Sequence, residues 1–137
     1  MAPSDRFVSE TTFHVRYAET DAMGVVHHTK YLVYFEEGRS DYMRQRERGY
    51  AEVEASSYYL PVSELGARFV GAANYGQRVT IRTWIEELRS RRLTFAYEVV
   101  EAESGDVIVT GFTRHVWTDR DGKVTTMPQQ WRGFLDD

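Results

Sequence analysis

One change of periodicity constrains the fold of this chain more than any other feature. From about Thr29, apolar positions recur at helical spacing, and charged residues lie mostly on the other side. This apolar face consists of Tyr31, Tyr34, Phe35, Gly38 and Tyr42. Thr29 is a plausible N-cap and Gly49 a plausible C-terminal stop. These bounds predict one helix of about 20 residues, roughly 30 Å long.

After this helix, the sequence has the period of two that is typical of strands. Four strand-like segments follow, at residues 59–70, 78–88, 92–101 and 106–118. Pro61 and Gly66 interrupt the first of them. The segments 103–106 and 119–122, each with one glycine, are predicted hairpin turns.

The chain therefore has one strand, then a long helix, then a series of antiparallel strands. Such elements pack most simply when one sheet wraps around the helix. We therefore predict an α+β fold in which a single helix supplies one side of the core. The chain of 137 residues is expected to form one domain, residues 1–137, that can bury a core without disulfides. It contains no cysteine, which excludes disulfide and thiolate chemistry.

Several classes of protein are disfavoured by what the sequence lacks. The N-terminus has no signal-peptide core and no apolar run could span a bilayer, so we expect a cytoplasmic protein without a membrane partner. A net charge of −4 argues against general nucleic-acid binding. The sequence has no Gly-x-Ser-x-Gly elbow, phosphate loop or dinucleotide fingerprint, and no histidines pair at the i, i+4 spacing of a helical zinc site.

A carboxylate directly before the helix is the first candidate for chemistry. Phe13, Val15 and Tyr17 alternate with polar residues as in a short strand, and the loop 18–24 then places Asp21 near the helix start. Backbone N–H groups at a helix start can stabilise an oxyanion, and a carboxylate can activate water or attack a carbonyl. Taken alone, the residues favour a role for Asp21 as no more than the cap of a turn, because Asp is common in such loops.

The segment Arg16–His28, followed by Tyr31, Glu37 and Arg39, resembles the 4-hydroxybenzoyl-CoA thioesterase family, especially its YbgC-like branch. The similarity continues through residues 67–69 and the later strands to the region of Pro128. The resemblance implies a hotdog fold, in which a curved antiparallel sheet wraps one long helix. It also implies hydrolysis of an acyl-CoA to a free acid and coenzyme A, with no metal or redox cofactor. A homo-oligomer, dimer or tetramer, is expected, because the family's active site lies between subunits.

The resemblance also assigns roles to individual residues. Asp21 matches the family's catalytic carboxylate, which acts as a general base or as a nucleophile. His28 matches the position at the helix start whose backbone N–H polarises the thioester carbonyl, and its imidazole is a further candidate for proton transfer. Tyr31 matches an aromatic residue at the helix start and is a candidate for substrate binding. Glu19 is a departure, since the family more often has Asp there.

The turn between the two longest predicted strands is basic. It contains Arg89, Ser90, Arg91 and Arg92. Arginine recognises phosphates well, so Arg89, Ser90 and Arg91 are candidates for binding the phosphates of coenzyme A; a solvated basic turn is the alternative.

Two other functions fit the same fold. A hotdog hydratase or dehydratase would pair a histidine with a carboxylate in a different pattern, which this sequence does not contain. A non-catalytic acyl-CoA-binding protein would have no need of Asp21.

Overall fold

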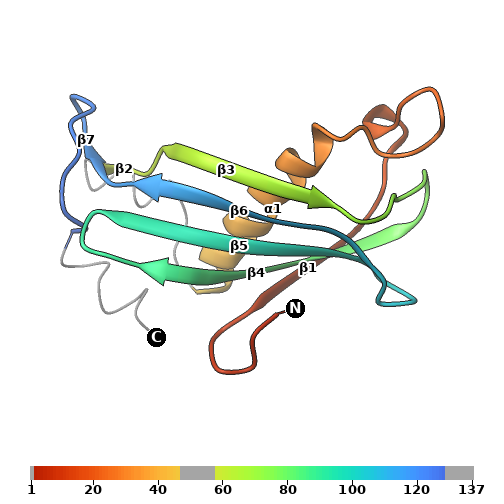
Figure 1. Cartoon of the computed structure of the whole chain (residues 1–137), viewed down its shortest axis with the longest axis horizontal. Coiled ribbons are helices and arrows are strands. Elements are labelled where there is room, and N and C mark those ends of the chain that lie inside the picture. Colours follow the sequence, from red (N-terminus) through yellow and green to blue (C-terminus); the bar gives the residue numbers. More distant parts are fainter. Residues whose placement is uncertain (1, 47–57, 129–137) are drawn as a thin grey trace.

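The computed structural model describes residues 2–46 and 58–128 (Figure 1). In chain order the elements are β1 (Ser9–His14), the 3-10 turn η1 (Tyr17–Glu19), α1 (Lys30–Gln45), β2 (Tyr58–Tyr59), β3 (Val62–Phe69), β4 (Arg78–Leu88), β5 (Arg92–Glu101), β6 (Val107–Val116) and β7 (Thr118–Asp119). The bounds of β4 and β5 are those predicted from the sequence.

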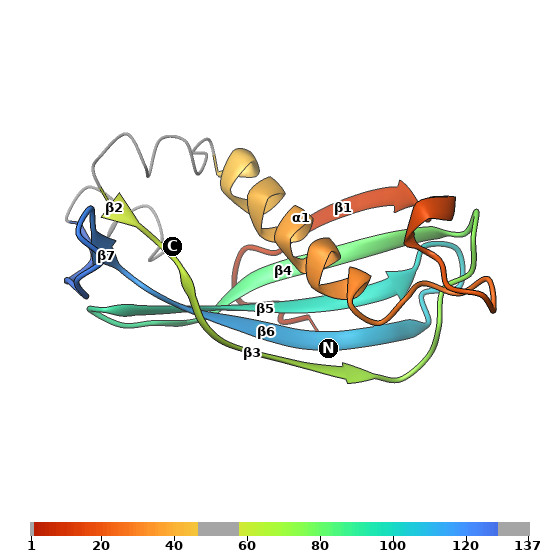
Figure 2. The same cartoon turned by 90° about the horizontal axis from the view of Figure 1, so that it is seen from above.

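Five of the strands form one antiparallel sheet in the order β1-β4-β5-β6-β3, and β2 pairs with β7 separately. Seen from above, α1 lies over one face of the curved sheet (Figure 2). Within the described residues, no helix covers the opposite face. The predicted α+β arrangement, with one helix on one side of the core, is confirmed.

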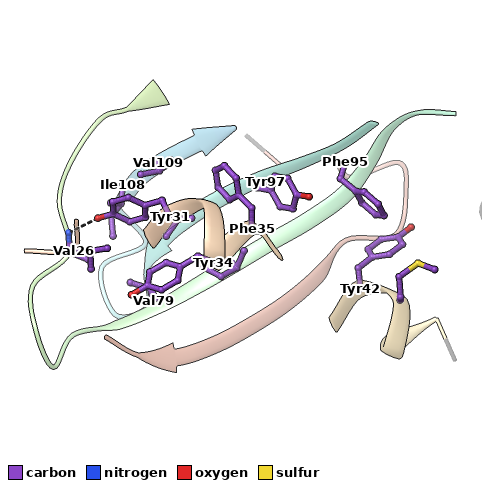
Figure 3. Close-up of a cluster of buried hydrophobic side chains, with 14 of the residues drawn as sticks. Val26, Tyr31, Tyr34, Phe35, Tyr42, Val79, Phe95, Tyr97, Ile108 and Val109 are labelled. Atoms are coloured by element: carbon purple, nitrogen blue, oxygen red, sulfur yellow. Dashed lines mark hydrogen bonds between the residues drawn. The ribbon is translucent and has the colours of Figure 1, made fainter. Parts of the chain in front are cut away.

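The predicted aromatic face of α1 forms the centre of the core (Figure 3). The Phe35 ring stacks on Tyr97 of β5 with centroids 4.4 Å apart. Tyr42 meets Phe95 of the same strand edge-on at 5.6 Å. Fully burying such a side chain stabilises the fold by about 1.5–3 kcal/mol, so this face holds the helix on the sheet.

Gly38 packs directly against β4. A Cβ atom at this position would lie 2.5 Å from Thr83 Oγ1 and 2.7 Å from a methyl carbon of Ile81. Both neighbours are side chains of the buried face of β4. The predicted apolar face therefore includes a glycine because a larger residue would push α1 off the sheet.

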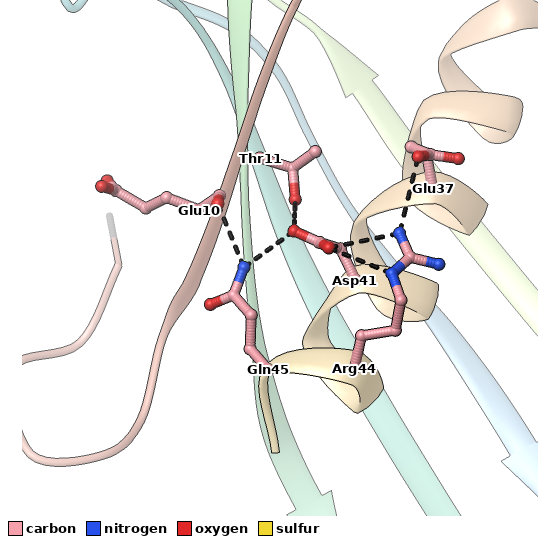
Figure 4. Close-up of polar contacts among 6 residues, drawn as sticks. All are labelled: Glu10, Thr11, Glu37, Asp41, Arg44 and Gln45. Atoms are coloured by element: carbon pink, nitrogen blue, oxygen red, sulfur yellow. Dashed lines mark hydrogen bonds and ion pairs between the residues drawn. The ribbon is translucent and has the colours of Figure 1, made fainter. Parts of the chain in front are cut away.

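The second half of α1 is tied to β1 by a polar cluster (Figure 4). The Asp41 carboxylate accepts hydrogen bonds from the Thr11 hydroxyl and from Gln45 Nε2, the latter at 2.7 Å. Arg44 forms an ion pair with Asp41 at 3.2 Å. These contacts hold the last turns of the helix against an edge strand.

One predicted boundary is wrong at the start of the chain. Strand β1 ends at His14, and Tyr17, predicted on its buried face, is 77% exposed at the start of η1. The reason is local, because Arg16 N donates to the Glu19 side chain at 3.0 Å and turns the chain out of the sheet. Thr29 is the N-cap residue of α1 as predicted, although its hydroxyl makes no capping hydrogen bond.

The first strand-like segment after the helix also differs from its prediction. It divides into β2 and β3 around Pro61, whose nitrogen cannot donate to a ladder. Gly66 remains inside β3, packed under the Phe112 ring. The described helix has 16 residues, and Gly49 lies outside the described residues.

Candidate active site

The loop between η1 and α1 folds back on itself. Thr20 and Val26 form an antiparallel bridge, and Asp21 N donates to Val25 O at 2.8 Å. The turn closes through Gly24, whose N–H donates to Asp21 O at 3.0 Å and whose φ of 80° favours glycine. This turn holds Asp21 opposite Val25, in the loop that leads into α1.

The Asp21 carboxylate is half-buried and serves its own turn. Its Oδ1 accepts a hydrogen bond from Met23 N at 2.8 Å. Within the described residues, no donor contacts Oδ2. The capping role considered from the sequence is therefore present, and it leaves one carboxylate oxygen for chemistry.

The backbone N–H groups near the helix start are almost all in use. Five of them donate to an acceptor at 2.8–3.3 Å, namely the N–H groups of His27, Thr29, Lys30, Tyr31 and Leu32. In the described part of the chain, nothing accepts a hydrogen bond from His28 N. Since the N-terminal end of a helix carries a partial positive charge, this amide is well placed to bind an oxyanion.

The imidazole of His28 is exposed. It stacks on the His27 ring with centroids 4.3 Å apart and meets Phe69 edge-on at 6.3 Å. His27 Nδ1 lies 2.8 Å from the Thr29 hydroxyl. His27 thus shapes the helix start, whereas the ring of His28 is accessible for contact with a substrate.

Tyr31, a predicted substrate-binding residue, is buried at the start of α1. Its hydroxyl oxygen accepts a hydrogen bond from Ala73 N at 3.2 Å, and burial raises the pKa of the phenol. Its ring lies 5.9 Å from that of Phe69. Tyr31 therefore connects α1 to the segment after β3, and its ring and that of His28 both contact Phe69.

Glu19 is the buried carboxylate of the loop, and the sequence did not reveal its contacts. The Tyr34 hydroxyl donates to its Oε1 at 2.7 Å, and Arg16 Nε donates to its Oε2 at 2.7 Å. Burial alone would raise the pKa of Glu19, but the hydrogen bonds from Arg16 and Tyr34 outweigh it and lower the pKa. The only signal in the sequence was the change from Asp to the longer Glu.

The basic turn between β4 and β5 is confirmed as a tight turn, with Arg89 N donating to Arg92 O at 2.8 Å. Glu87 neutralises part of its charge, forming ion pairs of 3.1 Å with Arg89 and 3.0 Å with Arg92. Arg91 is exposed, and no ion pair to it occurs within the described residues. Arg91 is therefore the side chain of this turn best able to bind an anion. The Ser90 carbonyl accepts a hydrogen bond from the backbone N–H of residue 127 at 2.6 Å.

This basic turn lies far from Asp21 in the described chain. Val15, just before the loop, donates to the carbonyl of Gln77 at the start of β4, whereas the turn follows the other end of that strand. At about 3.3 Å per residue, β4 places the two ends roughly 35 Å apart. In Figure 1 the loop around residue 20 and the β4–β5 turn lie at opposite ends of the sheet.

A groove of about 390 Å³ lies on the face of the sheet opposite the helix. Its lining includes Trp84, Thr94, Phe112 and Arg114. Neither Asp21 nor His28 takes part in it. The candidate chemistry is thus located at the helix start and not in this groove.

One long helix packed against a curved antiparallel sheet is the arrangement of the hotdog fold. The chain belongs to the thioesterase-like superfamily, which its residues 15–135 match. Within the described residues, no helix is long and apolar enough to cross a membrane.

Individual relatives agree with this assignment. The chain is 29% identical to YneP of Bacillus subtilis, named as an acyl-CoA thioesterase, over 95% of this chain and 91% of that one. It is 28% identical to the acyl-CoA thioester hydrolase YbgC of Escherichia coli over 66% of this chain and 67% of that one. The crystal structure of TT1821 from Thermus thermophilus has a TM-score of 0.88 and 41% identity, and the match covers 93% of this chain and 97% of TT1821. The predicted hotdog fold and the predicted enzyme class, a thioester hydrolase, are confirmed.

Proposed function

We propose that this protein hydrolyses acyl-CoA thioesters to a free acid and coenzyme A, with Asp21 as the catalytic carboxylate. The names of the relatives YneP and YbgC support the substrate class. The observation that carries the proposal concerns the His28 backbone N–H. This group has no acceptor within the described residues, and it follows the loop that contains Asp21. A location in the cytoplasm stays a prediction from the sequence.

The chemistry follows from these two groups. The thioester carbonyl oxygen would accept a hydrogen bond from His28 N, which stabilises the negative charge that develops on this oxygen. The Asp21 Oδ2 would take a proton from a water that attacks the carbonyl carbon, or would attack that carbon itself. In both routes the carbon–sulfur bond breaks and the thiolate of coenzyme A takes up a proton. The second route passes through an anhydride that water then hydrolyses.

The test is release of free thiol from a panel of acyl-CoAs that vary in chain length and aromatic character. We expect turnover of at least one member. Binding of coenzyme A without thiol release from any member would instead indicate a non-catalytic binding protein.

We further propose a homodimer that pairs through the β3 edge. The two edge strands of the sheet are β1 and β3. On β3, the apolar side chains of Val62, Leu65 and Phe69 are each more than 40% exposed, which is unusual for an edge strand in contact with water. The β1 edge is instead partly covered, because Gln45 donates to Glu10 O at 3.2 Å.

Antiparallel pairing of two β3 edges would also join the separated parts of the site. Such pairing reverses one sheet relative to the other, so the basic turn of one subunit would lie at the same end as Asp21 of its partner. A site made in this way needs both chains. Leu65→Lys is expected to give monomers by light scattering and reduced turnover by thiol release. Val124→Lys, at a residue that is 58% exposed against 48% for Leu65 but lies outside β3, should keep the wild-type assembly. An active, stable monomer would contradict the shared site.

A further inference from the structure

We infer that Glu19 is a positioning residue that sets the distance between Asp21 and the His28 backbone N–H; this inference rests on the proposed function. Glu19 is 9% exposed and belongs to the 3-10 turn that precedes the loop. Its side chain and its backbone carbonyl bind two different parts of the site.

The side chain connects the loop to the helix. Tyr34, in the second turn of α1, is buried and donates its hydroxyl to Glu19 Oε1 at 2.7 Å. Arg16 N donates to the same oxygen at 3.0 Å, and Arg16 Nε donates to Oε2 at 2.7 Å. Hydrogen bonds to an ionised carboxylate are about twice as strong as neutral ones, so both carboxylate oxygens are held firmly.

The backbone of Glu19 connects to the other side of the loop. Its carbonyl accepts a hydrogen bond from His27 N at 2.9 Å. His27 directly precedes His28, and Asp21 lies two residues after Glu19. A shift of Glu19 would therefore move the carboxylate and the amide relative to each other.

The contact between Glu19 and Tyr34 depends on the length of the side chain. Asp at this position would be shorter by one methylene, about 1.5 Å, and could not reach Tyr34 and Arg16 together. A misplacement of about 1 Å can lower turnover by about 100-fold, because the reacting groups lose their alignment. The same misplacement has little effect on how tightly the nucleotide part of the substrate binds.

The test compares Glu19→Asp, Glu19→Gln and Tyr34→Phe with the wild-type protein. We expect Glu19→Asp to lower kcat by at least about tenfold with KM within about twofold. Glu19→Gln should keep kcat within about threefold, because its oxygen still accepts from Tyr34 and from Arg16 N. The Arg16 guanidinium can turn away from the Gln NH2 group into solvent, since its side chain is 68% exposed. The double variant Glu19→Asp with Tyr34→Phe should be no slower than Glu19→Asp alone, because each change removes the same hydrogen bond, the one between Glu19 and Tyr34.

Asp41→Asn is the matched control. Asp41 also ties α1 to a neighbouring segment through its carboxylate, but at the other end of the helix. We expect this variant to lower the Tm and leave kcat unchanged, measured well below every Tm. If kcat falls together with Tm in the Glu19 variants and in Asp41→Asn alike, the inference is wrong and Glu19 has only a structural role.

Asp21→Asn separates the two proposals. If this variant is inactive while the Glu19 variants keep wild-type kcat, the catalytic role of Asp21 stands and the positioning role of Glu19 is wrong. If Asp21→Asn keeps wild-type turnover, the catalytic role fails and the inference about Glu19 fails with it. Loss of kcat in both Asp21→Asn and Glu19→Asp, with Asp41→Asn fully active, is the result we expect.

Discussion

Asp21 Oδ1 accepts a hydrogen bond from Met23 N at 2.8 Å, so the proposed catalytic carboxylate also caps its own turn. The two roles use different oxygens, because Oδ2 has no donor within the described chain. Asn retains an acceptor oxygen for Met23 but carries no charge and almost no basicity. A change to Asn therefore separates capping from catalysis.

We predict that Asp21→Asn lowers kcat by at least about 100-fold, the lower end of the range for removal of a general base. KM should change little and the Tm should stay near that of the wild type, because the cap remains. Steady-state thiol release and thermal unfolding check this. A variant with near-wild-type turnover would leave Asp21 only its capping role.

The imidazole of His28 is expected to contribute modestly. The ring is exposed, and within the described residues no hydrogen bond to it occurs, so His28→Ala keeps the backbone N–H and should lower kcat by no more than a few-fold. If the ring transfers a proton, the acid limb of the pH–rate profile should move. The exposed His14 of β1 provides the control variant. Identical profiles for wild type and His28→Ala would leave the backbone role alone.

Replacing Arg89 and Arg91 with Ala should raise KM for acyl-CoA several-fold and leave kcat nearly unchanged. Contacts to the phosphates act equally on the ground and transition states, which changes KM only. Arg91 should account for most of the effect, since Arg89 already pairs with Glu87. An acyl-pantetheine, which lacks the nucleotide, should be insensitive, and added salt should mimic the change.

Arg78→Ala is the control for this experiment. Arg78 is exposed and lies at the opposite end of β4, where it pairs with Glu103 at 3.6 Å. Its loss should leave KM unchanged. Equal KM values at low salt for wild type and the Arg89/Arg91 double variant would show that the turn is only a solvated basic loop.

A directed chain of hydrogen bonds keeps His115 neutral in the core. Its Nδ1 must donate to the carbonyl of Leu60 at 3.0 Å, so its Nε2 accepts from the Thr113 hydroxyl at 2.8 Å. The Thr113 oxygen in turn accepts from Tyr97 at 2.5 Å. Burial, assisted by repulsion from Arg39, lowers the pKa of His115 from 6.5 to about 4.

This depressed pKa predicts a loss of stability in acid. Above pH 6.5 the imidazole is neutral in both the folded and the unfolded chain, so it adds no pH dependence. Between pH 6.5 and about 4 the unfolded chain binds the proton first, and the free energy of unfolding should fall by about 3 kcal/mol at most. Urea unfolding at pH 7 and pH 4.5 measures this. His115→Phe, which cannot titrate, should lose that part of the pH dependence.

Gly38→Ala should destabilise the protein even though Ala is the better helix former. The added Cβ would lie 2.5 Å from Thr83 Oγ1, and overpacking of a core costs about 1–3 kcal/mol against a gain of about 1 kcal/mol in helix propensity. Thermal unfolding should show a lower Tm. Val33→Ala, on the exposed face of the same helix, should leave the Tm unchanged or raise it.

Much of the fold could be predicted because its signals are local. Strands β4 and β5 were predicted with their observed bounds, since an uninterrupted period of two ends in turn residues on both sides. The buried face of α1 followed from the spacing of Tyr34, Phe35 and Tyr42 in the same way. The position of Tyr17 was mispredicted, because the hydrogen bond from Arg16 to Glu19 overrides the alternation of the strand.

The sequence by itself determined the α+β fold, the helix face and the loop that presents Asp21, because periodicity and turn residues act over a few positions along the chain. Only the tertiary structure decided that Glu19 meets Tyr34, that the His28 amide has no acceptor in the described chain, and that the basic turn of the same chain lies far from Asp21. These relationships join residues from different elements. Their geometry depends on how the helix and sheet pack, which no local pattern encodes.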